Sequence, residues 1–272
     1  MSENDIKDAI DAGQAIAART NLPNGRGVAV VIPPGSEEHI FDFEPFAAHP
    51  ARRRGRFAFH DAASFAVYVG RHMTEDSLVV GDIEHHKIEA ALDGHGVNDD
   101  IAGWHQHRAA FDLRPTKPWL TWNKYNGQQM GQTDFASFIE DNLPDIVEPE
   151  GATILEIAKT LHIKNNVNFK SAIRLDTGEQ QFTFEDNHTA RAGAGMVAIP
   201  NTFVLGLQPF EGSETYKVTA RLRYRLNEGR LTLGYALVRP DRVQDDAFGS
   251  IVGEIAETLD ITVLAGSLPS SV

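Results

Sequence analysis

Residues 215–237 read TYKVTARLRYRLNEGRLTLGYAL, and this stretch decides the fold class. Polar and apolar residues alternate without a break from Thr215 to Leu226, which is the pattern of a strand with one buried and one exposed face. Asn227-Glu228-Gly229 supplies a turn. The alternation then resumes at Leu231, Leu233, Tyr235 and Leu237. The stretch therefore predicts a long antiparallel hairpin with an apolar inner face.

The outer face of the first strand of this hairpin is strongly basic, because it carries Lys217, Arg221, Arg223 and Arg225. Alternate residues lie about 6.6 Å apart along a strand, close to the repeat of a nucleic-acid backbone. A guanidinium group binds phosphate or carboxylate through two parallel hydrogen bonds. The interleaved tyrosines point to the opposite face and cannot stack on bases there. These four residues are candidate ligands for nucleic acid, and the alternative is that they pair with Asp and Glu of a neighbouring helix or subunit.

The elements on either side of the hairpin come in runs and not in β-α-β alternation. The spacing of apolar residues predicts helices at residues 4–19, 61–73, 116–122, 133–143, 154–161 and 241–255. Strands are predicted at residues 27–32, 77–80, 87–92, 167–175, 182–184, 202–207 and 261–264. This order predicts an α+β fold with a mainly antiparallel sheet, long hairpins in the C-terminal half and amphipathic helices packed against them.

The length of 272 residues fits one large domain or two modest ones. Pro144, Pro149 and the acidic residues around them interrupt the pattern. We therefore expect a mixed α/β region at 1–145 and a β-rich region with a C-terminal helix at 150–272, with one continuous domain as the alternative.

Composition excludes several kinds of site. The absence of cysteine excludes disulfides, thiolate metal ligands and a cysteine nucleophile. The first ten residues are polar and acidic, and no apolar run approaches the ~18 residues that a membrane span requires. We expect a cytoplasmic protein with no membrane partner.

The net charge of −13 is unevenly distributed. Residues 74–100 hold eight acids against Lys87, and residues 133–160 hold seven acids against Lys159. Arginine recurs at 52–56 and within the hairpin. Such a polarised molecule can attract a phosphate-rich partner locally, or it can pair its own opposite surfaces in a homo-oligomer.

Nine of the eleven histidines lie between His39 and His107, which suggests a metal site. His86, His105 and His107 are the candidate ligands, because imidazole with nearby carboxylates suits zinc, manganese or iron. The alternative is structural: His105 and His107 would share a strand face with Ala109, Phe111 and Leu113, where they would be buried and hydrogen-bonded.

Trp104, Trp119 and Trp122 form an aromatic segment that predicts either core residues or anchors of an interface. No catalytic motif accompanies them. Gly193–Ala198 matches G-x-G-x-x-A, but Pro200 prevents the helix that a dinucleotide site requires. We therefore expect no cofactor, and a non-enzymatic role is favoured over an enzymatic one.

Several further motifs carry a family resemblance. They are Ile88–Asp93, Trp104-x-x-His107, Thr116-x-x-Trp119-x-x-Trp122, Phe135-x-x-Phe138-Ile139-Glu140-Asp141-Asn142, Ile199-Pro200-x-x-Phe203 and Arg221-Leu222-Arg223-Tyr224-Arg225. With them the chain resembles the YfdQ-like family of phage and prophage proteins, a domain of unknown function. The resemblance implies a phage origin in a bacterial cytoplasm, and it implies no reaction.

We therefore expect a non-enzymatic phage accessory protein that acts by self-assembly, as a homo-oligomer, and by binding a host or phage protein. The first alternative is a nucleic-acid-associated protein of phage replication or recombination, or an anti-defence protein. Further alternatives are a metal-dependent hydrolase built on the histidines and a capsid-like shell.

Overall fold

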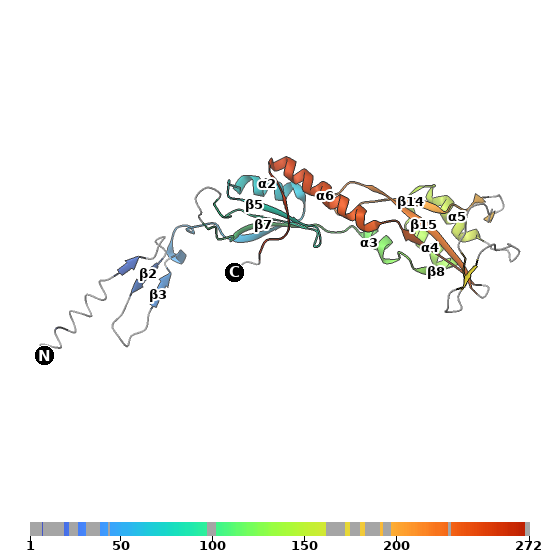
Figure 1. The fold of residues 1–272 in the computed structure, drawn as a ribbon, viewed down its shortest axis with the longest axis horizontal. Helices are drawn as coiled ribbons and strands as arrows, with labels where there is room; N and C mark the ends of the chain where they lie inside the picture. Colours follow the sequence, from blue (N-terminus) through green and yellow to red (C-terminus); the bar gives the residue numbers. More distant parts are fainter. Residues whose placement is uncertain are drawn as a thin grey trace. The chain divides into compact units, whose positions relative to one another are not determined.

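The computed structural model describes Lys7 and residues 19–21, 27–30, 39–42, 44–96, 102–161, 172–174, 180–182, 191–192, 197–227 and 230–269. The chain divides into two compact units, residues 1–55 and residues 56–272 (Figure 1). The interruption at 144–150 lies inside the second unit.

The first unit contains a small antiparallel sheet. Its strands, in sheet order, are β1 (Arg19–Asn21), β2 (Gly27–Val30) and β3 (His39–Asp42), followed by the short helix η1 (Glu44–Phe46). The strand predicted at 27–32 corresponds to β2. The helix predicted at 4–19 lies outside the described residues, apart from Lys7, which is helical, and Arg19, which begins β1.

The second unit begins with a five-stranded sheet, here called the N-terminal sheet. Its order is β17 (Leu264–Ala265), β5 (Leu78–Asp82), β6 (Lys87–Ala91), β7 (His107–Asp112) and β4 (Gly55–Phe59). β5, β6 and β7 are antiparallel, whereas β17 runs parallel to β5.

Two helices, α2 (Ala62–His72) and α6 (Pro240–Leu259), pack on one face of the N-terminal sheet (Figure 1). The carboxylate of Asp61 caps α2 by accepting the Ser64 N–H at 2.7 Å. Phe65 of α2 and Phe248 of α6 are buried in the resulting core.

A second five-stranded sheet, here called the C-terminal sheet, contains the predicted hairpin. Its order is β8 (Gln129–Gly131), β16 (Arg230–Leu237), β15 (Tyr216–Asn227), β14 (Thr202–Leu207) and β9 (Ile146–Glu148). Every neighbouring pair is antiparallel. The α+β class with a mainly antiparallel sheet and a long C-terminal hairpin is thereby confirmed.

Helices cover one face of the C-terminal sheet. They are α3 (Lys117–Lys124), α4 (Gln132–Asp141) and α5 (Gly151–Thr160), with the short helix η2 (Leu143–Asp145) between the last two. Their apolar sides meet the inward side chains of β14, β15 and β16 in one core. Thr116 caps α3, because its hydroxyl accepts the Trp119 N–H at 3.3 Å. Two strand pairs complete the described structure: β10 (Ala172–Arg174) with β11 (Gln180–Phe182), and β12 (Arg191–Ala192) with β13 (Val197–Ala198).

The last strand is displaced from its predicted position at 261–264. Asp260 adopts a left-handed conformation (φ 53°) that ends α6, and the Ile261 N–H still donates to the Ala256 carbonyl. Pairing with β5 therefore begins only at Leu264, opposite Val80. Within the described residues, no helix combines the length and apolar character that a bilayer span needs.

Candidate functional site

The outer face of the C-terminal sheet is the candidate binding surface. Along β15 the inward side chains of Val218, Ala220 and Leu222 are buried, whereas the cationic residues between them are exposed. These cationic residues, here called the basic row, are Lys217, Arg221, Arg223 and Arg225. Because the helices cover the inner face, strand alternation leaves the basic row on the open one.

Small residues flank the basic row on both neighbouring strands. On β16, Gly234 lies opposite Arg223 and Ala236 opposite Arg221, and on β14 Thr202 lies opposite Arg221. Directly opposite side chains are the ones that interact across a sheet. Neither arginine therefore has a carboxylate beside it on these strands. The outward positions of these small residues follow from the same alternation that places the basic row.

No residue of the basic row forms an ion pair within the described part of the chain, whereas other cations do. Arg56 and Lys87 contact the Glu89 carboxylate at 3.4 and 2.7 Å, and Lys159 contacts Glu140 at 3.2 Å. Two unit charges about 7 Å apart repel by roughly 0.6 kcal/mol in water. The basic row holds like charges side by side without compensation, so an acidic ligand relieves this repulsion when it binds.

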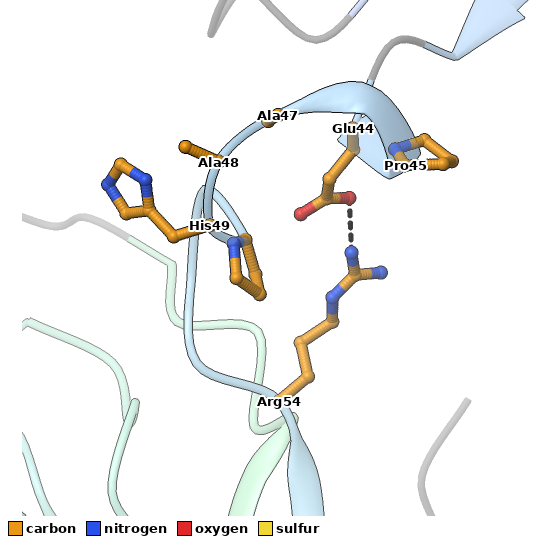
Figure 2. A pocket seen from close by; sticks show the side chains of 7 residues that line it. Glu44, Pro45, Ala47, Ala48, His49 and Arg54 are labelled. Atoms are coloured by element: carbon orange, nitrogen blue, oxygen red, sulfur yellow. Dashed lines mark hydrogen bonds and ion pairs between the residues drawn. The ribbon is translucent and has the colours of Figure 1, made fainter.

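The second basic stretch, at residues 52–56, is partly neutralised. Arg54 forms an ion pair with Glu44 (Figure 2), and Arg56 pairs with Glu89. Arg54 and Glu44 line a hollow of about 390 Å³ in the first unit together with Pro45, Ala47, Ala48, His49 and Pro50. Because its arginine is balanced, this hollow is a weaker candidate for an acidic ligand than the basic row.

The three tryptophans lie in two different environments. Trp119 and Trp122 are 3% and 0% exposed, and both belong to the core of the C-terminal sheet. Trp104 is 64% exposed. The hypothesis of an interface anchor is therefore wrong for Trp119 and Trp122, because their rings fill the space between α3 and the sheet. Trp104 alone of the three is accessible in the described structure.

The candidate metal ligands have separate surroundings. The ring of His86 packs against Phe210, with 5.0 Å between the ring centroids. His107 is buried and shares a hydrogen bond of 2.9 Å between its Nε2 and the Tyr68 hydroxyl. Within the described residues, no group of three or more His, Asp or Glu side chains is arranged to hold a metal ion.

His105 and His107 do not share a strand face, contrary to the prediction. β7 begins at His107, and His105 has a φ of 51°, which lies in the left-handed region and outside the range of a strand. The reason is Asp93, whose carboxylate accepts the backbone N–H groups of Gln106 and His107 at 3.0 and 2.9 Å. These two hydrogen bonds hold a tight loop directly before β7.

Comparison with known proteins identifies a family for this chain. The family DUF2303, described as an uncharacterized conserved protein, matches residues 3–268. The chain belongs to the DUF2303 family. No curated protein and no solved structure matches it. DUF2303 membership covers nearly the whole chain and assigns no reaction, so the basic row is the feature of this DUF2303 protein from which a function can be argued.

In this DUF2303 protein, the pKa of His105 provides a test of the loop before β7. Burial lowers the pKa of His105 from its ordinary value of 6.5, and the charges of His95 and Arg108 lower it further. The folded state therefore favours the neutral ring. The lowered pKa therefore contributes to the free energy of unfolding above about pH 6.5. This contribution declines as the pH falls towards the pKa of His105 in the folded state.

An NMR titration of the His105 imidazole is expected to show a lower midpoint in the folded protein than in a urea-unfolded sample. The variant His105→Asn should weaken the loss of stability as the pH falls below about 6.5. A midpoint equal to or above that of the unfolded sample would contradict the assignment.

Proposed function

We propose that this protein is a non-enzymatic binding protein whose basic row holds an acidic macromolecular partner. The observation that carries the proposal is the line of exposed cations on one sheet face without an ion pair among the described residues. Arginine suits this role because its planar guanidinium group presents several donors to a carboxylate or phosphate. On a molecule of net charge −13, such a local patch also selects which surface an acidic partner meets first.

We further propose that the protein is a phage or prophage accessory protein that works in the bacterial cytoplasm by self-assembly and partner binding. The support for this part is the resemblance of its motifs to YfdQ-like proteins. The basic row supplies the surface that self-assembly or partner binding would use.

Nucleic acid is the second candidate ligand, and the spacing of the basic row favours it. Alternate residues of a strand lie about 6.6–6.8 Å apart, close to the backbone repeat of a nucleic acid. Tyr224 points inward and packs against the core, so it cannot stack on a base at the open face. Binding would rest on phosphate contacts, and its affinity would fall steeply with salt.

The test measures fluorescence anisotropy of two labelled probes, poly-glutamate and a single-stranded oligonucleotide, over a series of salt concentrations. The row variant carries Arg221→Ser, Arg223→Ser and Arg225→Ser. We expect wild-type protein to bind at least one probe at low salt, and we expect the row variant to bind it roughly tenfold more weakly or worse.

The control variant removes the same amount of charge from exposed residues outside the C-terminal sheet. It carries Arg71→Ser, Lys117→Ser and Arg242→Ser. It should bind like wild type, because its substitutions leave the basic row unchanged. Equal binding by wild type and the row variant, or no binding of either probe by wild type, overturns the proposed function.

A further inference from the structure

We infer that the acidic partner of the basic row is the α4–α5 surface of a second copy of this chain, so that copies associate head to tail. This inference rests on the proposed function and names its partner. Both surfaces belong to one packed part of the molecule, the C-terminal sheet and the helices on its inner face.

The outer surfaces of α4 and α5 and the segment that joins them are acidic. Four exposed carboxylates without an ion pair among the described residues, here called the acidic set, are Asp134, Asp141, Glu150 and Glu156, and Glu148 of the joining strand β9 is likewise exposed and without an ion pair there. The remaining exposed acid of these helices, Glu140, pairs with Lys159 at 3.2 Å and links α4 to α5. The acidic set is thus opposite in charge to the basic row, and neither is compensated by an ion pair among the described residues.

The acidic set and the basic row lie on opposite sides of one core. Phe135 and Ile139 of α4 and Ile157 of α5 are buried against the inward residues of the sheet. The same strands that send their apolar side chains into this core present the basic row on the other side. The core therefore separates the two charged surfaces, which cannot meet within a single copy. Each can be neutralised by another molecule.

This arrangement determines the kind of assembly. A symmetric contact would place one basic row on another, and like charges at close range repel. A contact between the basic row of one copy and the acidic set of the next is heterologous. Each added copy leaves one unused surface of each sign, so the product is a closed ring or an open filament.

A protein surface fits the open face better than a nucleic acid does. The outward positions of β14, β15 and β16 carry no aromatic residue, so bases find no stacking partner on these strands. Ala236 and Thr202 on either side of Arg221 leave a low surface there for a helix pair, whereas Gln128 and Gln129 fill the space outside Gly234. Carboxylates of the acidic set supply the acceptors that guanidinium groups bind in pairs.

The experiment uses the full chain and two variants that each remove one surface. The first is the row variant defined above. The second, the helix variant, carries Asp134→Asn, Asp141→Asn and Glu156→Gln. Circular dichroism spectra should match wild type for both, because all the replaced side chains are exposed. Sedimentation velocity is then measured over a range of protein concentrations at low and high salt.

Wild-type protein is expected to form species larger than a dimer as its concentration rises, and less so at high salt. Each variant alone should associate roughly tenfold more weakly or worse, because it lacks one half of every contact. An equimolar mixture should form dimers and nothing larger, because the row variant retains the acidic set and the helix variant retains the basic row.

A matched variant controls for the loss of acidic charge. It carries Asp245→Asn, Glu254→Gln and Glu257→Gln, which are exposed residues of α6, and it should assemble like wild type. Failure of the mixture to dimerise overturns the inference, and so does unchanged assembly of either surface variant. A wild-type monomer that still binds the oligonucleotide through the basic row overturns the inference and leaves the proposed function standing. A wild-type monomer that binds neither probe overturns both.

Discussion

Replacing Trp122 with alanine is expected to lower the free energy of unfolding by about 3–5 kcal/mol. The side chain is fully buried between α3 and the C-terminal sheet. Its ring lies 5.0 Å from the rings of both Phe138 and Tyr235, and its Nε1 donates to the Asp145 carboxylate at 2.7 Å. The substitution removes these contacts and leaves a cavity beside a carboxylate that has lost its donor.

Urea unfolding followed by circular dichroism measures the effect. Leu120→Ala is the matched control, because Leu120 lies in the same helix and is 53% exposed. Its free energy of unfolding should differ from wild type by about 0.5 kcal/mol or less. Equal losses for the two variants would show that Trp122 is not the centre of this core.

Gly234→Ala is expected to destabilise the protein by about 1–3 kcal/mol or more. A Cβ atom at position 234 would lie 2.1 Å from the Gln128 backbone carbonyl oxygen and 2.9 Å from the side-chain Nε2 of Gln129. The nearer atom belongs to the backbone, so it cannot swing away as the end of a side chain can. β8 must therefore move off β16, which breaks the pairing of Gln129 with Gly234.

Thermal or urea unfolding tests this result against a glycine in open surroundings. Gly249 lies within α6, and a Cβ there would meet no atom within 4 Å. Gly249→Ala should therefore raise the stability by roughly 0.5–1 kcal/mol, because glycine has the larger entropy to lose in a helix. The two substitutions are expected to act with opposite signs, and a stabilising Gly234→Ala would refute the close approach of β8.

The parts of the fold that local sequence predicts are those in which neighbouring residues decide the conformation. The hairpin of β15 and β16 follows from strict alternation around one turn. The starts of α2 and α3 follow from Asp61 and Thr116, whose side chains accept backbone N–H groups three residues later.

The parts that sequence did not predict depend on partners far along the chain. β8 and β9 are three residues long and exist because they pair with β16 and β14. β17 begins later than predicted because its partner β5 is reached only after the turn at Asp260. Strands of two or three residues contain too few alternating residues to be predicted from the sequence.

The candidate site residues likewise include some whose placement local sequence predicts and others whose placement depends on distant parts of the chain. That the cations of the basic row share one face follows from alternation within one strand, so it could be predicted. The separation of His86 from His107, the burial of Trp119 and the exposure of Trp104 could not, because each depends on which distant elements pack beside them. Asp93 reshapes the loop at His105 through hydrogen bonds that span more than ten residues.

The sequence by itself determined that four cations share one face of a long strand, because side chains of a strand alternate with a period of two. Only the tertiary structure decided that this face is open, that its neighbours on β14 and β16 are small, and that the acids of α4 and α5 lie on the opposite side of the same core. The physical reason is that apolar burial decides which face of a sheet the helices cover, and that choice joins residues separated by scores of positions in the chain.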